Sequence, residues 1–439
     1  MAAGVPHRCF ELGDRVGGNW VFQNTSGRSG IYRSLHINTS RQRMEFRELP
    51  MRTDLPDYPH HRHVAEYFES YARHFGLHDS ITFDTEVERC VPHGVAGART
   101  WTVTVRHRVT GERATHEFDA LVVANGHHSE PSLPPPPPGH FSGATLHSHA
   151  YVDPTNPLDL RGKRVVVVGM GNSAMDIACE VCRPGVAERL FLSARRGAWV
   201  IPKYLRGRPV DQGSSFVPSF LPDKARRWLV TRGFRFLFGR MQDYGLPEPD
   251  HLLGEAHPTI SSELPTLVGS GDIVPKPSIA GFDGDTVVFA DGSRERADVV
   301  IWCTGYRVSF PFFDADVVSA PDNALPLFHR VFDPRHPDIA FIGLAQPLGA
   351  IMPIVEQQSR WVAEYFTKRY ELPPVAQMRS TIEKSEARSR TRFVASPRHT
   401  MQIDPDVYLT ELDRERARGR RRASANRAAE TEGQLRGTG

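Results

Sequence analysis

The sequence predicts an α/β protein built around a parallel β-sheet. Three observations support this: a βαβ unit made by Lys163–Val168, a helix and Arg189–Ser193; a buried strand at Asp298–Trp302; and the end of a strand at Cys9–Glu11. Lys163–Val168 is a continuous apolar run, which is typical of a strand buried on both faces of a parallel sheet. The chain of 439 residues is long enough for roughly two or three domains.

The first part of the chain contains one clear helix pattern and two strand patterns. From Arg62 to Phe75 apolar residues recur at steps of three and four, which predicts an amphipathic helix. Thr100–Val105 and His116–Val123 alternate apolar and polar residues, which predicts strands. Pro134–Pro138 is a run of prolines, and we expect a stiff connector between two lobes there.

The second part of the chain has a less regular pattern. Trp199–Thr266 is rich in Arg, Gly and Pro, which indicates an irregular insertion. Thr286–Phe289 predicts a strand that ends in a turn at Asp291. Arg414–Gly439 has low complexity and contains eight Arg and three Glu, so we expect a disordered basic tail. Such a tail is usually solvated; contact with nucleic acid or an anionic membrane is the less favoured interpretation.

Composition limits the class of protein. Lys plus Arg total 54 against 51 Asp plus Glu, so the net charge of +3 excludes a polycation built to bind nucleic acid. Five cysteines are too few for a disulfide framework and favour a reducing compartment. The apolar runs are too short to span a membrane, and no signal-peptide pattern is present. We therefore expect a cytoplasmic protein without a membrane or nucleic-acid partner.

One cysteine pattern and one group of histidines are compatible with a redox site or a metal site, and we favour neither. Cys179 and Cys182 form a CxxC, which is compatible with a disulfide reductase. Both cysteines lie on a predicted helix, however, where buried cysteine is common packing. Histidines such as His60, His127 and His147 lack acidic partners at ligand spacing, so we predict no metal.

The glycine-rich turn after Lys163–Val168 predicts a dinucleotide site. Gly169, Gly171 and Ala174 form GxGxxA between a strand and a helix, the context in which this pattern binds a pyrophosphate. The phosphates would lie at the helix N-terminus. Arg195 and Arg196 follow the next strand, and guanidinium groups suit a 2′-phosphate, so NADPH is favoured over NADH. The alternatives are a tight turn that binds nothing and two solvated arginines.

The N-terminus carries a second dinucleotide signal that is incomplete. Glu11 ends a strand at the place where a ribose-binding acid belongs, and a Gly-Gly-Asn-Trp turn begins at Gly17. Met1–Pro6 resembles the last turn of a helix with Gly4 as its C-cap. A preceding strand and glycine-rich loop are missing, so we expect the natural protein to begin upstream by about thirty residues, the size of a strand plus helix.

These residues together resemble the flavin-containing monooxygenases. The resemblance runs from about Cys9 to Tyr370, and Phe141–Tyr151 fits the FxGxxxHxxxY signature of that family. The chain is also similar to the family in VVVVGMGNSAMDIA, SARRGAWV, HPTISSELP, VVIWCTGYRVSFPFF and IGLAQPLGAIMPIVEQQSRW.

The resemblance implies two interleaved Rossmann-like dinucleotide-binding domains, with the NADPH domain inserted into the FAD domain. The implied domains are residues 1–146 (FAD, first part, N-terminally incomplete), 147–280 (NADPH, with an insertion at 199–266), 281–413 (FAD, second part, and C-terminal helices) and 414–439 (the disordered basic tail).

The resemblance also implies the reaction. NADPH would reduce FAD, and reduced flavin would take up O2 to give a C4a-hydroperoxyflavin that oxygenates a nucleophilic nitrogen or sulfur atom of a small molecule, as in N,N-dimethylaniline monooxygenation. A Baeyer–Villiger or oxidative-decarboxylation monooxygenase is one alternative. A remnant that binds NADPH but not FAD is the other, because the first glycine loop is missing.

Residue roles follow from the same resemblance. Asn38 would be the catalytic amide beside flavin and nicotinamide, since an amide both donates and accepts hydrogen bonds without adding charge. Without the resemblance, a loop Asn that caps its own backbone is the favoured interpretation. The implied FAD contacts are Glu11, Gly17, Gly18, Asn19, Trp20, Ile37, Asn38, Thr39, Gly305 and Gln346. The implied NADPH contacts are Gly169, Gly171, Asn172, Ser173, Ala174, Met175, Asp176, Arg195 and Arg196.

Overall fold

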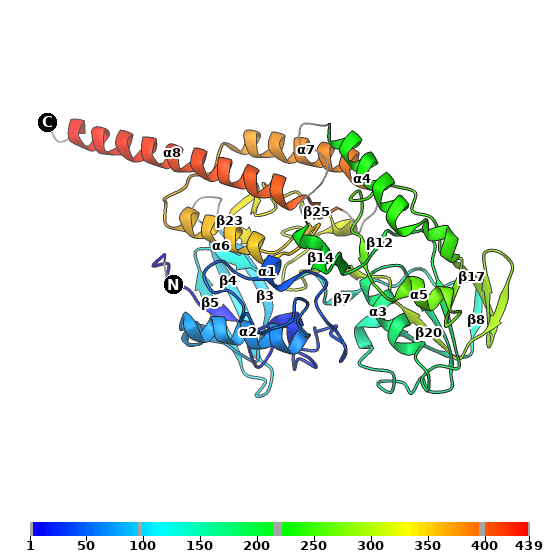
Figure 1. Cartoon of the computed structure of the whole chain (residues 1–439). Coiled ribbons are helices and arrows are strands. Elements are labelled where there is room, and N and C mark those ends of the chain that lie inside the picture. Colours follow the sequence, from blue (N-terminus) through cyan, green and yellow to red (C-terminus); the bar gives the residue numbers. More distant parts are fainter. Residues whose placement is uncertain (1–2, 95–98, 214–221, 395–399, 438–439) are drawn as a thin grey trace.

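The computed structural model describes residues 3–94, 99–213, 222–394 and 400–437. Its central feature is a five-stranded parallel sheet in the order β16-β11-β10-β20-β9. The strands are β16 (Ile273–Lys276), β11 (Arg189–Ser193), β10 (Arg164–Val168), β20 (Val299–Trp302) and β9 (Ala144–His147). This sheet and its helices form one end of the molecule, at the lower right of Figure 1.

The predicted βαβ unit is confirmed. β10 leads into α3 (Asn172–Val181), and β11 then pairs in parallel with β10. Val165, Val166 and Val167 are completely buried, as expected for a strand with side chains packed on both faces of the sheet. The carboxyl ends of β10, β11 and β20 therefore meet at one edge, where an α/β sheet binds its ligands.

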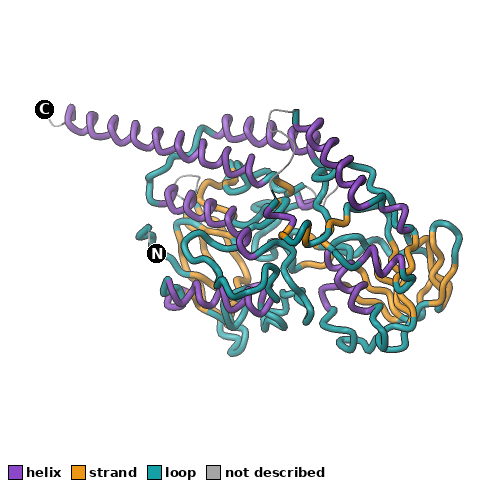
Figure 2. Tube along the Cα trace, in the orientation of Figure 1, coloured by secondary structure: helices purple, strands orange, loops and turns teal. Residues whose placement is uncertain are grey.

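Eight α-helices are described, besides short 3-10 helices. The longest three lie together at the top of the view in Figure 2. The helix predicted at 62–75 is confirmed as α2. The helices are α1 (Arg41–Met44), α2 (His61–His74), α3 (Asn172–Val181), α4 (Asp223–Phe238), α5 (Leu264–Gly269), α6 (Met352–Phe366), α7 (Val375–Arg392) and α8 (Pro405–Gly437).

The other strands form smaller sheets. Strand formation is confirmed in both segments predicted to alternate, although the second is divided between β5 and β6. The sheets are β3-β4-β5 (Thr85–His93, Thr100–His107, Arg113–Phe118), β22-β23-β6 (Phe332–Asp333, His336–Phe341, Leu121–Val123), β19-β18-β17-β8 (Arg294–Arg296, Thr286–Phe289, Ile279–Gly284, Gly139–Phe141), β1-β2 (Cys9–Phe10, Ile81–Thr82), β21-β7 (Tyr306–Arg307, Glu130–Pro131), β24-β25 (Gln346–Pro347, Gln402–Ile403), β12-β15 (Val200–Ile201, Thr259–Ile260) and β13-β14 (Tyr204–Leu205, Arg208–Pro209).

The parallel sheet extends beyond the segment 147–280 that the sequence assigns to the NADPH domain. β20 belongs to the predicted second FAD part, yet it pairs with β10 along Val165–Val168. β9 pairs with β20 on its other side. Both strands are apolar and complete a sheet that β10, β11 and β16 begin, so the sheet runs across the boundaries predicted after residues 146 and 280. Those domain boundaries stay a prediction.

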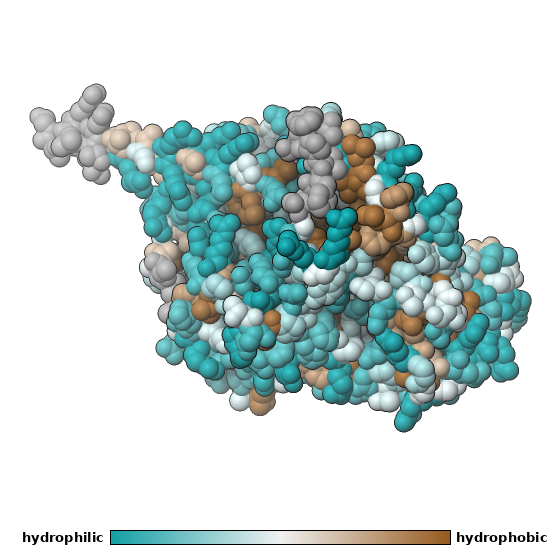
Figure 3. Space-filling view, in the orientation of Figure 1, coloured by the Kyte–Doolittle hydropathy of each residue, from teal (hydrophilic) through white to brown (hydrophobic). Residues whose placement is uncertain are grey.

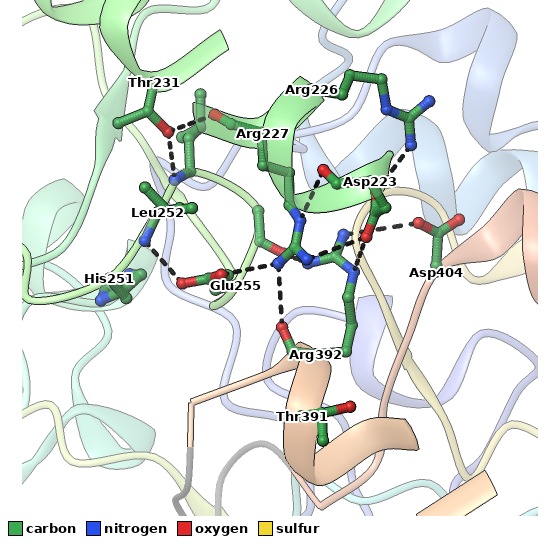
Figure 4. Close-up of polar contacts among 12 residues, drawn as sticks. Asp223, Arg226, Arg227, Thr231, His251, Leu252, Glu255, Thr391, Arg392 and Asp404 are labelled. Atoms are coloured by element: carbon green, nitrogen blue, oxygen red, sulfur yellow. Dashed lines mark hydrogen bonds and ion pairs between the residues drawn. The ribbon is translucent and has the colours of Figure 1, made fainter. Parts of the chain in front are cut away.

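The insertion predicted as irregular contains the regular helix α4. Arg227 of α4 contacts Asp223 at 3.0 Å and Glu255 at 2.8 Å, and Asp223 also contacts Arg392 at the end of α7. Arg392 in turn approaches Asp404, just before α8, at 3.7 Å. Figure 4 shows Asp223 lying between the two arginines. This network ties the insertion to the C-terminal part of the chain.

The disorder predicted for 414–439 is wrong for most of that segment, because α8 continues to Gly437. Arg416 contacts Glu364 of α6 at 2.6 Å, and Arg420 contacts the same carboxylate. Gly419 has no room for a side chain, because a Cβ there would overlap the ring of Tyr370. Close packing and ion pairs thus hold a segment whose composition alone indicates disorder.

The surface differs between these two helical regions. Figure 3 shows the exposed length of α8 as mainly hydrophilic, whereas hydrophobic side chains lie over α4. On α4 the exposed apolar residues are Trp228, Leu229, Phe236 and Leu237. Among the described residues, no helix has the length and hydropathy required to cross a membrane.

Candidate functional site: two linked dinucleotide clefts

The turn between β10 and α3 is shaped for close approach of a ligand. Gly169 has a φ of +134°, and a Cβ there would lie only 2.6 Å from the carbonyl oxygen of Cys303. Only glycine combines that backbone conformation with that contact. Gly169 N donates to the carbonyl of Ser193 at the end of β11 at 2.9 Å. The turn is therefore fixed between the ends of β11 and β20.

The first turn of α3 has no side-chain cap. Gly171 is the N-cap residue, and in the described part of the chain no side-chain cap hydrogen bond is found at this helix start. Asn172 is engaged elsewhere, because its Oδ1 accepts from Ile260 N at 2.9 Å, and Thr259 donates to the carbonyl of Met170. β15 thus supports the turn from outside. Uncapped N–H groups at a helix start are suited to an anion such as a pyrophosphate.

Some predicted NADPH contacts line the turn, and others are buried in the core. Gly169, Gly171, Asn172 and Ser173 line the turn itself. Ala174 and Met175 are completely buried in the core with the β10 valines. Asp176 accepts a hydrogen bond from Tyr32, and burial raises its pKa to about 6. Direct cofactor contact by Ala174, Met175 and Asp176 stays a prediction. Within the protein, Ala174 and Met175 pack in the core and Asp176 binds Tyr32.

Arg195 and Arg196 lie directly beyond β11, and both are exposed. Arg196 is bound to Asp250 at 2.8 Å. No hydrogen bond or ion pair to Arg195 is found within the described residues, so its guanidinium is available to a phosphate. The two arginines are therefore not equivalent, which their sequence does not reveal.

The N-terminal cluster is built around Glu11 and the Gly-Gly-Asn-Trp turn. Glu11 Oε1 accepts from Gly13 N at 2.7 Å, and burial raises the pKa of Glu11. Asn24 Nδ2 donates to the carbonyl of Gly18 at 2.9 Å, which holds the turn against the strand end. Gly17 has a φ of +119°. Gly4, predicted to be a helix C-cap, also has positive φ, while Met1 and Ala2 lie outside the described residues.

Asn38 follows Ile37, which shares a core cluster with Trp20 of this turn. Asn19 accepts from Gly30 N at 3.0 Å and so fixes the start of the segment that leads to Asn38. Trp20 packs against the same core cluster as Ile37, which is 2 % exposed. The Oδ1 of Asn38 is buried and finds no hydrogen-bond partner among the residues that the structure describes. A buried acceptor without a partner is costly, so it fits a donor group on a bound ligand.

The remaining predicted flavin-side residues come from the second half of the chain. Gly305 follows β20, and its carbonyl accepts from Ser132 N at 2.9 Å. Gln346 begins β24 and pairs with Gln402 of β25. Thr39 is partly buried next to Asn38. Ala350 and Met352, just after β24, pack in the cluster that contains Ile37 and Trp20.

Contacts join the glycine turn at Gly169 to the N-terminal cluster around Glu11. The carbonyl of Cys303 lies beside Gly169, and three residues further on the hydroxyl of Tyr306 lies 2.5 Å from where a Gly30 side chain would begin. His147 packs edge-on against Tyr306, and burial lowers the pKa of His147 to about 4, so it is neutral at pH 7. Site prediction missed Tyr306 and His147, although both lie in the quoted sequence motifs.

The candidate site fits two dinucleotides rather than a disulfide or metal centre. The turn at Gly169, the uncapped α3, the available Arg195 and the unpartnered Asn38 suit phosphates and a polar ring. Cys179 and Cys182 are free thiols, and burial raises the pKa of both. In the described ranges, histidine, cysteine and acidic side chains form no group of three able to hold a metal.

Comparison with known proteins decides the family. A profile of flavin-binding monooxygenase-like proteins matches residues 1–417. The chain belongs to this family. Flavin-containing monooxygenase 5 of Rattus norvegicus is 38% identical over 428 residues, covering 94% of this chain and 78% of the relative. Flavin-containing monooxygenase 3 of Homo sapiens is 34% identical with the same coverage. The protein is therefore an NADPH- and FAD-dependent flavin monooxygenase.

Solved structures show the same fold. The S-allyl-L-cysteine S-oxygenase from Allium sativum gives a TM-score of 0.69 at 24% identity and covers 98% of this chain and 89% of its own. A steroid monooxygenase bound to NADP gives 0.67 at 17% identity, covering 94% and 93%. The expected pair of Rossmann-like domains is confirmed. The expectation that further residues precede Met1 stays a prediction.

Proposed function

We propose that this monooxygenase oxygenates a nucleophilic nitrogen or sulfur atom of a small molecule. The observation that carries the proposal is identity along almost the whole chain to relatives that include the N-oxide-forming dimethylaniline monooxygenase 2 of Rattus norvegicus, at 35%. When bound, FAD and NADPH supply the electrons that split O2, so that one oxygen atom enters the substrate and the other leaves as water.

We assign FAD to the region of Glu11, the Gly17–Trp20 turn, Asn38, Gly305 and Gln346, which we call the flavin cleft. The unpartnered Oδ1 of Asn38 supports this assignment, because a ring N–H or amide donor would satisfy it. The amide neither gains nor loses a proton near neutral pH and orients its neighbours without adding charge. The packed cluster around Ile37 keeps water from one side of this cleft.

We assign NADPH to the turn at Gly169–Ser173, with Arg195 on the 2′-phosphate. The five-stranded sheet supports a division in which residues 144–302 form the NADPH domain and the flanking segments form the FAD domain. A cytoplasmic location is part of the proposal and is supported by the five cysteines, all of which are free thiols.

The test is product analysis with purified protein, added FAD, NADPH and 18O2. N,N-dimethylaniline and methyl phenyl sulfide are compared with cyclohexanone as substrates. We expect 18O in an N-oxide or sulfoxide, and no lactone. Lactone alone would favour Baeyer–Villiger chemistry and contradict the proposal. Binding of NADP+ without any flavin absorbance after FAD addition would favour the non-catalytic remnant.

Replacement of Asn38 tests its assignment. Asn38→Ala should reduce the yield of oxygenated product per NADPH by roughly 100-fold, the range seen when one preorganised polar group is removed from an active site. Ser34→Ala, at an exposed position on the same segment, is the matched control and should keep full yield.

A further inference from the structure

One side-chain contact joins the Asn38 segment to the NADPH helix. Tyr32 is 3 % exposed, and its hydroxyl donates to Asp176 on the second turn of α3, 144 residues away in sequence. Asp176 is partly buried, and the charges that act on it are Lys203, Glu180 and Glu263. A hydrogen bond to a carboxylate that is shielded from water is stronger than one between neutral groups.

The segment between Gly30 and Asn38 is held at both ends by the FAD side of the molecule. Gly30 N donates to Asn19 Oδ1 at 3.0 Å, and Ile37 N donates to the carbonyl of Pro59 at 3.1 Å. Between these anchors, Arg33 N donates to the carbonyl of Val152 at 2.8 Å. Tyr32 reaches α3 from the middle of the segment, one turn from the residues that receive the pyrophosphate.

A second tyrosine–carboxylate pair lies next to Tyr32 and Asp176. Tyr151 OH donates to Glu180 Oε2 at 2.8 Å, four residues further along α3. The rings of Tyr32 and Tyr151 pack edge-on with centroids 6.1 Å apart. Tyr151, at 1 % exposure, is as buried as Tyr32. Tyr151 does not belong to the Asn38 segment, so it provides a matched comparison of equal chemistry.

We propose that Tyr32 and Asp176 are positioning residues that set the Asn38 segment at a fixed place relative to the glycine turn of α3. The proposal rests on the assigned roles of Asn38 and the turn. The reacting rings of the two cofactors meet only if the two clefts are in register, and small misplacements of reacting groups cost large factors in rate. Tyr32 supplies that register through its hydrogen bond to Asp176.

The first test measures hydrogen exchange of peptides covering residues 31–38 in the wild type, Tyr32→Phe and Tyr151→Phe. We expect exchange in Tyr32→Phe to be at least about tenfold faster, equivalent to losing a hydrogen bond to a charged group. Tyr151→Phe should leave this segment at the wild-type rate. Equal acceleration in both variants, or none in Tyr32→Phe, would overturn the proposal.

A second variant separates positioning from the cost of a buried unpaired charge. Asp176→Asn retains an acceptor for Tyr32 and should keep slow exchange. The double variant Y32F/D176N removes both the hydrogen bond and the charge, so it should regain thermal stability while exchange over 31–38 stays fast. Slow exchange in the double variant would show that the contact does not position the segment.

The last measurement is the yield of oxygenated product per NADPH consumed. Tyr32→Phe should lower the yield of oxygenated product per NADPH roughly tenfold, with H2O2 making up the difference, while the Kd for NADP+ measured by calorimetry stays within about twofold. Tyr151→Phe should keep wild-type coupling. Unchanged coupling in Tyr32→Phe would contradict the proposal. The exchange measurement needs neither flavin nor substrate, so it stands even if the proposed reaction fails.

Discussion

Two arginine-rich stretches of this chain look alike in sequence and differ in structure. Arg195 and Arg196 follow the carboxyl end of β11 in the parallel sheet, and both are exposed. Arg416 and Arg420 lie in the basic C-terminal segment, yet they share one carboxylate, Glu364 of α6. The stretch predicted to be solvated is the one with buried partners, which teaches that a run of charge shows its role only when its partners are known.

The largest effect should come from the C-terminal stretch. Arg416 and Glu364 are 10 % and 11 % exposed, so Arg416→Ala leaves a mostly buried carboxylate with Arg420 as its remaining partner. We expect a loss of about 3 kcal/mol in the free energy of unfolding, measured by denaturant melts. Arg418→Ala is the control, because Arg418 is 61 % exposed and lies 3.9 Å from Glu415; it should change stability by less than about 0.5 kcal/mol. Equal losses of unfolding free energy in Arg416→Ala and Arg418→Ala would show that the contact with Glu364 does not make Arg416 special.

The next effect concerns the β11 arginines. Arg195→Ala should raise the Kd for NADPH by roughly 10- to 100-fold at low salt, because a charge-assisted phosphate contact is lost, and leave the Kd for NADH unchanged. Arg196→Ala should have a smaller effect, since Asp250 already holds that guanidinium. Isothermal titration with both nucleotides measures the difference. A parallel loss of NADH binding in Arg195→Ala would mean that Arg195 does not bind the 2′-phosphate.

The smallest effect is pH-dependent. Burial by itself would raise the pKa of Glu364, but hydrogen bonds and charge from Arg420 and Arg416 outweigh it and hold the pKa below its ordinary value. The stability from this pair is thus present above the unfolded pKa of about 4.3 and is lost as pH falls through the lower folded value. Glu364→Gln should flatten the fall in melting temperature between about pH 5 and pH 3. An unchanged acid profile would show that Glu364 is not the group responsible.

Local patterns were sufficient for the parts of the fold that depend on local packing. β11 and β18 have the predicted bounds, and α2 begins and ends within one residue of its prediction, because periodicity reports burial directly. The glycine turn was also predictable, since Gly169 and Gly171 carry a pattern with a steric reason. The role of Asn38 came only from the family resemblance.

Features that depend on distant partners were not predictable. Glu364 and Arg416 are 52 residues apart, and Tyr32 is 144 residues from Asp176. No periodicity links such positions, so the sequence predicts disorder from Arg414 onward, where α8 continues, and gives no signal for Tyr32. The sheet to which β20 belongs was not predictable for the same reason: an apolar strand fits any parallel sheet, and only its pairing with β10 shows which one.

The pairing of β24 with β25 has a consequence for biosynthesis. Gln346 N donates to the carbonyl of Met401 at 2.8 Å, and Leu348 N donates to that of Ile403 at 3.2 Å. The strand beside the proposed flavin cleft is therefore completed by residues made more than fifty positions later. A ribosome-bound chain that has emerged only to α7 leaves this edge unpaired and prone to misassociation. The edge of β24 can be paired only after Ile403 has been synthesised.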